Sequence, residues 1–266
     1  MPEYQIKTNI IRTEHLSSDM VRLTLDAPDI ASAAKPGQFV MVRVDDQCDP
    51  LLRRPFSIYQ ATADGRLQIL FKVLGKGTRL LAATRTGQRL NLVGPLGKGF
   101  NLSAGRGKRV CLIGGGMGAA PLFFLAQEFM RVFDPEKLLV LLGARNAQEL
   151  HAVATDFEAL GVELLMATDD GSAAHHGLVI DLIDGTMGGS SDWAVYSCGP
   201  HPMLRAVAAI CLERGWPCQV SLETMMACGI SACLGCAIPR AEGTGEGYLH
   251  VCKDGPVFAA GDVLWR

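Results

Sequence analysis

The chain has 266 residues, of which 48% are hydrophobic and 20% are charged, and its formal net charge is -2. This is the composition of a globular protein with room for two domains and a small module, each with its own core. The small net charge and the lack of a lysine or arginine run exclude an electrostatic footprint for nucleic acid or an anionic membrane, so we expect neither as a partner.

Cysteine usage and the first residues indicate the compartment. Residues 1–7 have no apolar core and no cleavage site, so we expect no secretory signal. Nine cysteines without export predict a cytoplasmic protein whose thiolates remain available as metal ligands. Residues 110–127 carry no charge, but glycines and a proline interrupt them, which favours a strand, a turn and a buried helix over a membrane span.

The first hundred residues alternate short β-rich runs with turn sequences. The runs cover residues 4–11, 21–25, 39–44, 56–59 and 67–73. Many short strands at this spacing predict an antiparallel barrel, which we assign to residues 1–102.

The pattern changes near Gly105, where strands begin to alternate with helices. We expect strands at residues 110–113, 138–142, 162–167 and 194–197, and helices at residues 119–132, 157–160, 178–183 and 202–214. Such alternation predicts a doubly wound parallel sheet with helices on both faces, here assigned to residues 103–217. Residues 218–266 then form a third, cysteine-rich module.

A tetrapeptide at the start of one barrel strand is a candidate binding site. It consists of Arg54, Pro55, Phe56 and Ser57. An arginine fork can bind a pyrophosphate through two hydrogen bonds, and the serine hydroxyl can reach the polar edge of a flat ring. Taken alone, the motif is more typical of an exposed arginine beside a strand-capping serine.

A strand edge and a glycine-rich loop follow the tetrapeptide in the chain. They supply Phe71, Lys72 and Val73, and then Gly77 and Thr78. Because the loop enters a helix at Thr78, its backbone N–H groups can meet a phosphate. This second element strengthens the prediction of a nucleotide-like cofactor on the barrel.

Two further motifs lie at strand ends of the predicted parallel sheet. The first motif contains Gly114, Gly116 and Gly118, which follow a strand and open a helix, as in dinucleotide-binding turns. The loop is not a strict G-x-G-x-x-G, so a tight turn of an unrelated α/β protein is the alternative interpretation. The second motif is Cys198-Gly199-Pro200. Cys198 lies either near a bound nicotinamide or in the core as a structural thiol. We interpret residues 169–176, which include two aspartates and two histidines, as a solvated turn.

Four cysteines near the end of the chain carry the strongest chemical prediction. They are Cys228, Cys233, Cys236 and Cys252, separated by four, two and fifteen residues. This arrangement is typical of a plant-type 2Fe-2S cluster, and small residues fill the loop as close packing around a cluster requires. Structural zinc and disulfides are the alternatives, but zinc sites usually pair two short knuckles and only one is present.

The three parts together resemble the ferredoxin reductase superfamily, and within it the electron transfer subunits of NAD-dependent (type B) dihydroorotate dehydrogenases. The likeness spans nearly the whole chain. The motifs that carry it are residues 52–58 (LRRPFSI), 114–121 (GGGMGAAP), 196–200 (YSCGP), 221–223 (SLE) and 250–258 (HVCKDGPVF).

The resemblance implies a set of cofactors and a partner. FAD would be held by residues 54–57 with residues 71–73, Gly77 and Thr78, and the four cysteines would hold the cluster beside a separate catalytic subunit that carries FMN and dihydroorotate. We expect a heterotetramer with two copies of each subunit. Electrons would pass from that subunit through the cluster and FAD to NAD, with no protein general base.

Two residues depart from the family pattern, and two other functions remain open. Phe56 stands where the superfamily often has tyrosine, and Ser231 stands where glycine is expected within the cluster loop.

Arg145 follows a strand where it could bind a 2′-phosphate, so the preference for NAD over NADP comes from the resemblance alone. The alternatives are a reductase subunit serving sulfide, sulfite or a hydrogenase, and a zinc-stabilised flavin-binding module without turnover.

Overall fold

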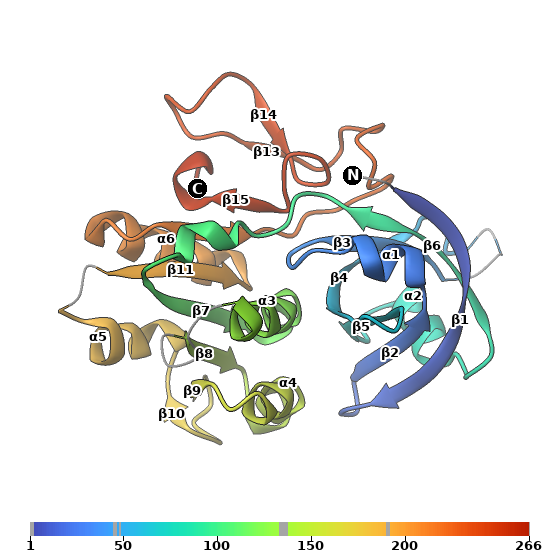
Figure 1. The fold of residues 1–266 in the computed structure, drawn as a ribbon, viewed down its shortest axis with the longest axis horizontal. Coiled ribbons are helices and arrows are strands. Elements are labelled where there is room, and N and C mark those ends of the chain that lie inside the picture. Colours follow the sequence, from blue (N-terminus) through green and yellow to red (C-terminus); the bar gives the residue numbers. More distant parts are fainter. Residues whose placement is uncertain (1–2, 45–46, 48, 133–137, 190–191, 266) are drawn as a thin grey trace.

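The N-terminal part of the chain forms a closed antiparallel barrel (Figure 1). The computed structural model describes residues 3–44, 47, 49–132, 138–189 and 192–265. The barrel strands are β1 (Tyr4–His15), β2 (Met20–Asp26), β3 (Phe39–Arg43), β4 (Arg54–Ala61), β5 (Arg66–Lys72) and β6 (Arg89–Leu96), in the order β1-β2-β5-β4-β3-β6. Two short helices, α1 (Pro28–Ala33) and α2 (Lys76–Ala82), interrupt them. Apolar residues at every second position, such as Val21, Leu23 and Leu25, fill the barrel. The predicted barrel is confirmed.

The second part is a seven-stranded sheet in the order β10-β9-β8-β7-β11-β12-β15. Its strands are β7 (Arg109–Gly115), β8 (Leu138–Ala144), β9 (Glu163–Thr168), β10 (His175–His176), β11 (Trp193–Cys198), β12 (Cys218–Ser221) and β15 (Val257–Ala259). All neighbouring pairs are parallel except β12 with β15. Its helices are α3 (Ala119–Val132), α4 (Ala147–Ala159), α5 (Leu182–Met187) and α6 (His201–Arg214).

Both faces of this sheet are covered, which explains its nearly continuous apolar strands. In β7, Val110 and Leu112 belong to the core under α3 and α4, whereas Cys111 and Ile113 belong to the core under α5 and α6. Side chains alternate between faces along a strand, so a strand buried on both sides must be apolar at every position. The doubly wound architecture is confirmed.

Three predicted details of this region are wrong. Helix α4 is much longer than residues 157–160, because the Asn146 side chain caps its start by accepting a hydrogen bond from the Glu149 N–H at 3.0 Å. The expected helix at residues 178–183 begins as a 3₁₀ turn, and α5 starts at Leu182. His175 and His176 are exposed, as expected, but they form the short edge strand β10 instead of part of a turn.

The C-terminal segment is tied into the sheet at both of its ends. After β12 the chain forms a loop that contains Cys228, Cys233 and Cys236 (residues 222–236, the cysteine loop) and then the hairpin of β13 (Ala237–Pro239) and β14 (Tyr248–His250). It returns to the sheet as β15, beside β12. The Leu222 N–H donates to Pro256 O at 2.9 Å, and the Lys98 N–H donates to Gly255 O at 2.5 Å. The cysteine loop therefore lies beside both the sheet and the end of the barrel (Figure 1).

Helix α3 joins the barrel to the sheet. Its Phe123 ring stacks on Tyr59 of β4 with ring centroids 4.6 Å apart, and Phe124 is part of the barrel core.

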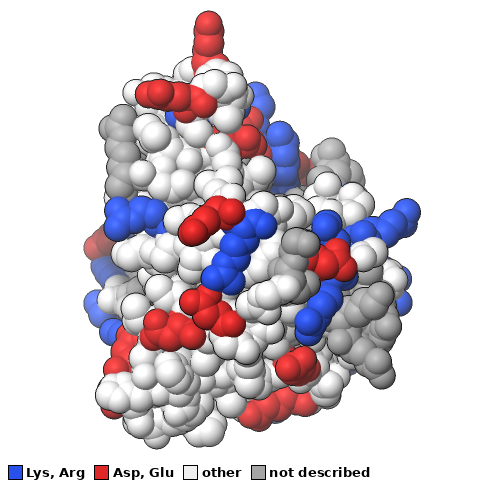
Figure 2. Space-filling view, turned by 90° about the vertical axis from the view of Figure 1, so that its left-hand side faces the viewer, with Lys and Arg blue, Asp and Glu red and all other residues white. Residues whose placement is uncertain are grey.

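On the face at the left of Figure 1, acidic and basic side chains are interspersed (Figure 2). Within the described ranges, no helix combines the length and apolar character needed to cross a bilayer.

The packing of α3 against the barrel gives a stability prediction. Replacing Phe123 with alanine removes the Tyr59 stacking and the edge contact with Phe157, and should lower the free energy of unfolding by about 3–5 kcal/mol. Urea unfolding followed by circular dichroism measures the change. Val132→Ala, at the exposed end of the same helix, should change it by about 0.5 kcal/mol or less. Equal effects of both variants would contradict the role assigned to Phe123.

Candidate functional site

The cysteine loop directs backbone N–H groups at its sulfurs. The Ala232 and Cys233 N–H groups each donate to Cys228 Sγ at 3.3 Å, and the Ser231 N–H donates to Cys252 Sγ at 3.3 Å. The Cys252 N–H donates to Cys236 Sγ at 3.5 Å. Such donors stabilise thiolates and the cluster that they hold.

The four thiols lie as two pairs rather than as one converging set. Cys236 Sγ and Cys252 Sγ are 3.3 Å apart, and Cys228 contacts Cys233. Among the described residues, no three Cys, His, Asp or Glu side chains converge on a single metal position. A tetrahedral zinc ion needs one convergent set, whereas a two-iron cluster takes two thiolates on each iron. The pairs therefore fit the 2Fe-2S cluster better than zinc.

The two pairs differ in exposure and in proton affinity. Burial works against the Cys228 thiolate, but hydrogen bonds from the Cys233 and Ile230 backbone lower its pKa to about 7. Burial and the neighbouring Cys236 thiol raise the pKa of Cys252 to about 12. Cys233 is exposed, whereas Cys236 and Cys252 are buried. One side of the loop thus faces solvent and the other faces the protein interior.

Positive backbone φ angles shape the loop. Gly229 has φ +72°, and a Cβ there would lie 2.5 Å from Cγ of Met41 on β3. Ser231 has φ +62°, a left-handed conformation that glycine adopts at little cost. The glycine expected from the family pattern at position 231 therefore has a physical reason, and Ser231 keeps the same conformation at some cost in strain.

On the barrel, the structure brings the candidate tetrapeptide and glycine loop together. A Cβ on Gly77 would lie 3.3 Å from Nε of Arg54, so the arginine side chain lies directly over this glycine. Thr78 Oγ1 accepts hydrogen bonds from the Leu74 and Gly75 N–H groups at 2.9 and 3.0 Å, which fixes the loop conformation. Helix α2 begins at Lys76 rather than at Thr78.

The remaining barrel candidates face in different directions. The Phe56 ring lies in the barrel core, 5.3 Å from the Phe71 ring between centroids. Ser57 pairs with Phe39, and Pro55 pairs with Met41, so both belong to the β3–β4 ladder. Val73 packs against the same core. Lys72 forms ion pairs with Asp19 of the barrel and with Glu149 of α4, which are described below.

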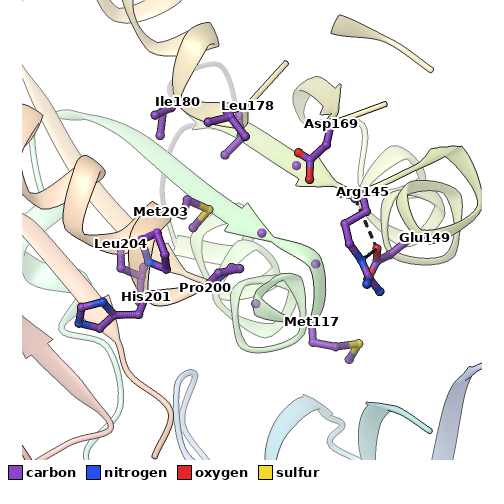
Figure 3. Close-up of a pocket in the computed structure, with 18 of the residues that line it drawn as sticks. Met117, Arg145, Glu149, Asp169, Leu178, Ile180, Pro200, His201, Met203 and Leu204 are labelled. Atoms are coloured by element: carbon purple, nitrogen blue, oxygen red, sulfur yellow. Dashed lines mark hydrogen bonds and ion pairs between the residues drawn. The ribbon is translucent and has the colours of Figure 1, made fainter. Parts of the chain in front are cut away.

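A pocket of about 670 Å³ opens at the carboxyl ends of the central parallel strands (Figure 3). The predicted residues Gly116, Gly118, Gly199 and Pro200 line it, whereas Gly114 and Cys198 do not. The pocket is next to β7 and β11, where the strand order reverses and where open α/β sheets bind ligands. It has the position and volume for a dinucleotide.

Gly118 allows the two turns of the pocket to meet. A Cβ at this position would lie 2.0 Å from Cys198 O, a contact that no side chain tolerates. Cys198 is buried, and burial together with the nearby Glu223 carboxylate raises the pKa of its thiol well above the usual value. Cys198 thus lies behind the wall of the pocket, as a neutral thiol.

Sequence reasoning missed several residues that line this pocket. Glu149, Asp169 and Glu223 place carboxylates on its wall, and Met203 adds an apolar side chain. Asp169 follows β9, so its position just after a strand could have indicated it. Burial raises the pKa of Glu223. Glu149 lies inside α4, three residues after the helix cap Asn146. In the sequence this position is a helix-start signal and does not by itself indicate a pocket.

Three family models cover most of the chain. The Oxidoreductase FAD-binding domain matches residues 7–100, the Oxidoreductase NAD-binding domain matches residues 112–209, and the Iron-sulfur cluster binding domain of dihydroorotate dehydrogenase B matches residues 223–264. The cofactors predicted from the sequence, FAD, NAD and an iron–sulfur cluster, are confirmed at the level of these domains.

Individual relatives decide the family. A protein of Desulforamulus reducens, named dihydroorotate dehydrogenase B (NAD(+)), electron transfer subunit, is 41% identical over 245 residues, which cover 92% of each chain. The chain belongs to this family of electron transfer subunits. The family member of Caldanaerobacter subterraneus subsp. tengcongensis is 38% identical over 98% of this chain and 99% of its own.

The fold of the dihydroorotate dehydrogenase B electron transfer subunits is shared with other flavoproteins. A structure described as an NADH-dependent reduced ferredoxin-NADP oxidoreductase, studied for flavin-based electron bifurcation, superposes with a TM-score of 0.83 at 26% identity. The match covers 97% of this chain and 90% of that one. The expected place in the ferredoxin reductase superfamily is confirmed.

The contact at Gly118 predicts the effect of a single methyl group. Gly118→Ala should destabilise the protein by about 2–3 kcal/mol and lower kcat/KM for NADH by about tenfold or more, because the backbone at Cys198 must move. Thermal unfolding and NADH oxidation with an artificial acceptor measure both effects. Gly185→Ala in α5, with open space around the new methyl group, should be neutral or stabilising. A wild-type NADH rate in Gly118→Ala would refute the prediction.

The strain at Ser231 predicts a stabilising substitution. Ser231→Gly should raise stability by about 0.5–1 kcal/mol, since glycine adopts φ +62° without a steric penalty and keeps the N–H that points at Cys252. Thermal unfolding of the iron-loaded protein measures it. Ser32→Gly in helix α1 should instead destabilise, by about 0.5–1 kcal/mol. Destabilisation by both substitutions would show that Ser231 is not strained.

Proposed function

We propose that this chain is the electron transfer subunit of a dihydroorotate dehydrogenase, passing electrons from a catalytic subunit through a 2Fe-2S cluster and FAD to NAD+ in pyrimidine biosynthesis. The observation that carries the proposal is the pairing of the four cysteines within residues 223–264, the segment that the dihydroorotate dehydrogenase B cluster model matches. Flavin chemistry supplies the conversion between single electrons and a hydride.

Each part of the chain has its own task in this proposal. Residues 1–102 hold FAD, residues 103–217 hold NAD, and residues 218–266 hold the cluster, with β12 anchoring this last part to the sheet. On the barrel, the Arg54 fork serves the FAD pyrophosphate beside Gly77, whose missing side chain leaves room for it. In the sheet domain, Gly116, Gly118, Gly199 and Pro200 form the wall that receives the dinucleotide.

The cysteine loop also supports a docking surface for the partner. Exposed apolar side chains flank the exposed Cys233 in the sequence: Met225, Ile230 and Leu234 are 90%, 52% and 55% exposed. Apolar side chains this exposed within one ten-residue segment are typical of a protein interface. We assign this surface to the catalytic subunit, which we expect to carry FMN and to form a heterotetramer with two copies of each chain. The thiolate ligands favour a cytoplasmic location.

The composition of the purified complex tests the proposal. Prepared without air together with its native partner, the complex should contain FMN, FAD, iron and acid-labile sulfur, and should reduce NAD+ with dihydroorotate. Flavin without iron or labile sulfide would overturn the cluster assignment. An iron-containing complex that fails to oxidise dihydroorotate would point to another reductase partner.

Removing one cluster ligand should separate the two halves of the reaction. Cys233→Ser should abolish dihydroorotate-driven NAD+ reduction, because it removes a thiolate from the path, and should spare NADH oxidation by an artificial acceptor. Stopped-flow absorbance measures both rates. Cys211→Ala removes a buried thiol far from the loop in the chain and should retain both. If dihydroorotate still reduces NAD+ in Cys233→Ser, the cluster is not on the path.

A charge on the apolar surface should weaken the complex. Leu234→Glu is expected to raise the Kd for the catalytic subunit by about tenfold or more, because a desolvated carboxylate would face an apolar partner surface. Analytical ultracentrifugation measures the association. Leu212→Glu, an equally exposed leucine on α6, serves as the matched control and should leave the Kd unchanged. Equal weakening by both would show a general loss of solubility instead.

A further inference from the structure

One carboxylate on the pocket wall is held by two cations from different domains. Glu149 Oε1 lies 2.9 Å from Lys72 Nζ, at the end of barrel strand β5. Glu149 Oε2 lies 3.1 Å from Arg145 Nε, the pair joined by a dashed line in Figure 3. Asp19 Oδ2 binds the same lysine at 3.2 Å. Lys72 and Glu149 are each only 11% exposed, so solvent screens this pair weakly.

The electrostatics of Glu149 agree with this double pairing. Burial alone would raise the pKa of its carboxyl group, but the hydrogen bonds from Lys72 and Arg145 lower it below the usual value. Burial likewise opposes the charge of Lys72, and Glu149 and Asp19 raise its pKa instead. Glu149 and Lys72 are therefore charged at neutral pH, and the Arg145 side chain, although 68% exposed, is turned toward Glu149.

These residues lie at one particular end of the pocket. Arg145 follows β8, the second strand of the parallel sheet, and Asp169 follows the neighbouring β9. In doubly wound folds, the pyrophosphate sits at the turn after the first strand, and residues at the end of the second strand meet the adenosine ribose. Glu149 Oε1 lies 3.6 Å from where a Cβ on Gly116 would be, so this carboxylate also borders the glycine turn.

The charge balance of the pocket disfavours a 2′-phosphate. Among the described residues that line it, Arg145 is the one lysine or arginine, whereas Glu149, Asp169 and Glu223 are acidic. A 2′-phosphate needs a cation that can turn toward it, and a 2′-hydroxyl can donate to a carboxylate. With Arg145 turned toward Glu149, the described residues at the adenosine end of the pocket offer carboxylates to a 2′-hydroxyl and no free cation to a 2′-phosphate.

We propose that Glu149 determines the coenzyme preference of this chain by holding Arg145 away from a 2′-phosphate. It acts through Arg145 and is therefore a positioning residue. Its second contact, with Lys72, fixes the carboxylate against the barrel, so the choice of coenzyme is built at the junction of the two domains. This inference rests on the proposed oxidation and reduction of NAD(H) by the chain.

Coenzyme kinetics of a neutral, isosteric variant test the inference. In the FAD-loaded protein with an artificial acceptor, Glu149→Gln should raise the ratio of kcat/KM for NADPH to that for NADH by about tenfold or more, since a released guanidinium can form a charge-assisted hydrogen bond with the phosphate. The double variant Glu149→Gln/Arg145→Gln should lose this gain. Glu128→Gln removes a carboxylate from the Glu128–Arg131 pair on α3, outside the pocket, and should keep the wild-type ratio.

The outcomes separate this inference from the proposed function. An unchanged ratio in folded, flavin-loaded Glu149→Gln, or a gain that persists in the double variant, would overturn the role of Glu149. Wild-type protein that oxidises neither coenzyme would instead refute the proposed function. Should Glu149→Gln not fold, wild-type protein still gives a test: calorimetric titration should show weaker binding of adenosine 2′,5′-bisphosphate than of 5′-AMP, and equal or tighter binding would overturn the inference.

Discussion

Holding four thiolates together, three from one short loop and the fourth from Cys252 in the turn after β14, is the constraint on which the arrangement of this molecule depends. Thiolates repel one another, and here backbone N–H groups of Ser231, Ala232 and Cys233 offset that repulsion at distances of 3.3 Å. A loop can direct its amides in this way only if its ends are fixed. The pairing of β12 with β11 and with β15 fixes them, so the parallel sheet serves the cluster as well as the dinucleotide.

The same anchoring places the segment that carries the cysteines against both the barrel and the pocket of the parallel sheet. Gly229 packs against Met41 of the barrel, while Leu222 and Glu223, just before the loop, line the dinucleotide pocket. The contact with Met41 needs a glycine at position 229, because a larger residue would prevent so close a backbone approach. The contacts with the pocket need side chains that the sheet has already positioned. Electron transfer between separate carriers depends on such fixed proximity, and here the protein supplies it through its backbone.

Local patterns in the sequence predicted much of this, because they encode local physics. The cysteine spacing, the strand and glycine turn before α3, and the alternation of strands with helices are each set by neighbouring residues, and they indicated the cluster, the pocket and both domains. Contacts between distant residues were not predictable in the same way. The ion pair of Lys72 with Glu149 joins residues 77 positions apart, and the contact of Gly118 with Cys198 depends on which strands are neighbours. That Lys72 serves FAD stays a prediction, and only the tertiary structure shows that its side chain also pairs with Glu149 on α4.

Helix α3 has a consequence for how such subunits diverge. The helix starts at the glycine turn of the dinucleotide pocket, yet its Phe123 and Phe124 are packed against barrel residues. The boundary that a sequence alignment draws between the two domains is therefore not a boundary in packing. A chimera that exchanges the barrel between relatives would have to carry the barrel-facing side of α3 with it, and evolutionary change on that side should be matched by change at Tyr59 and its neighbours.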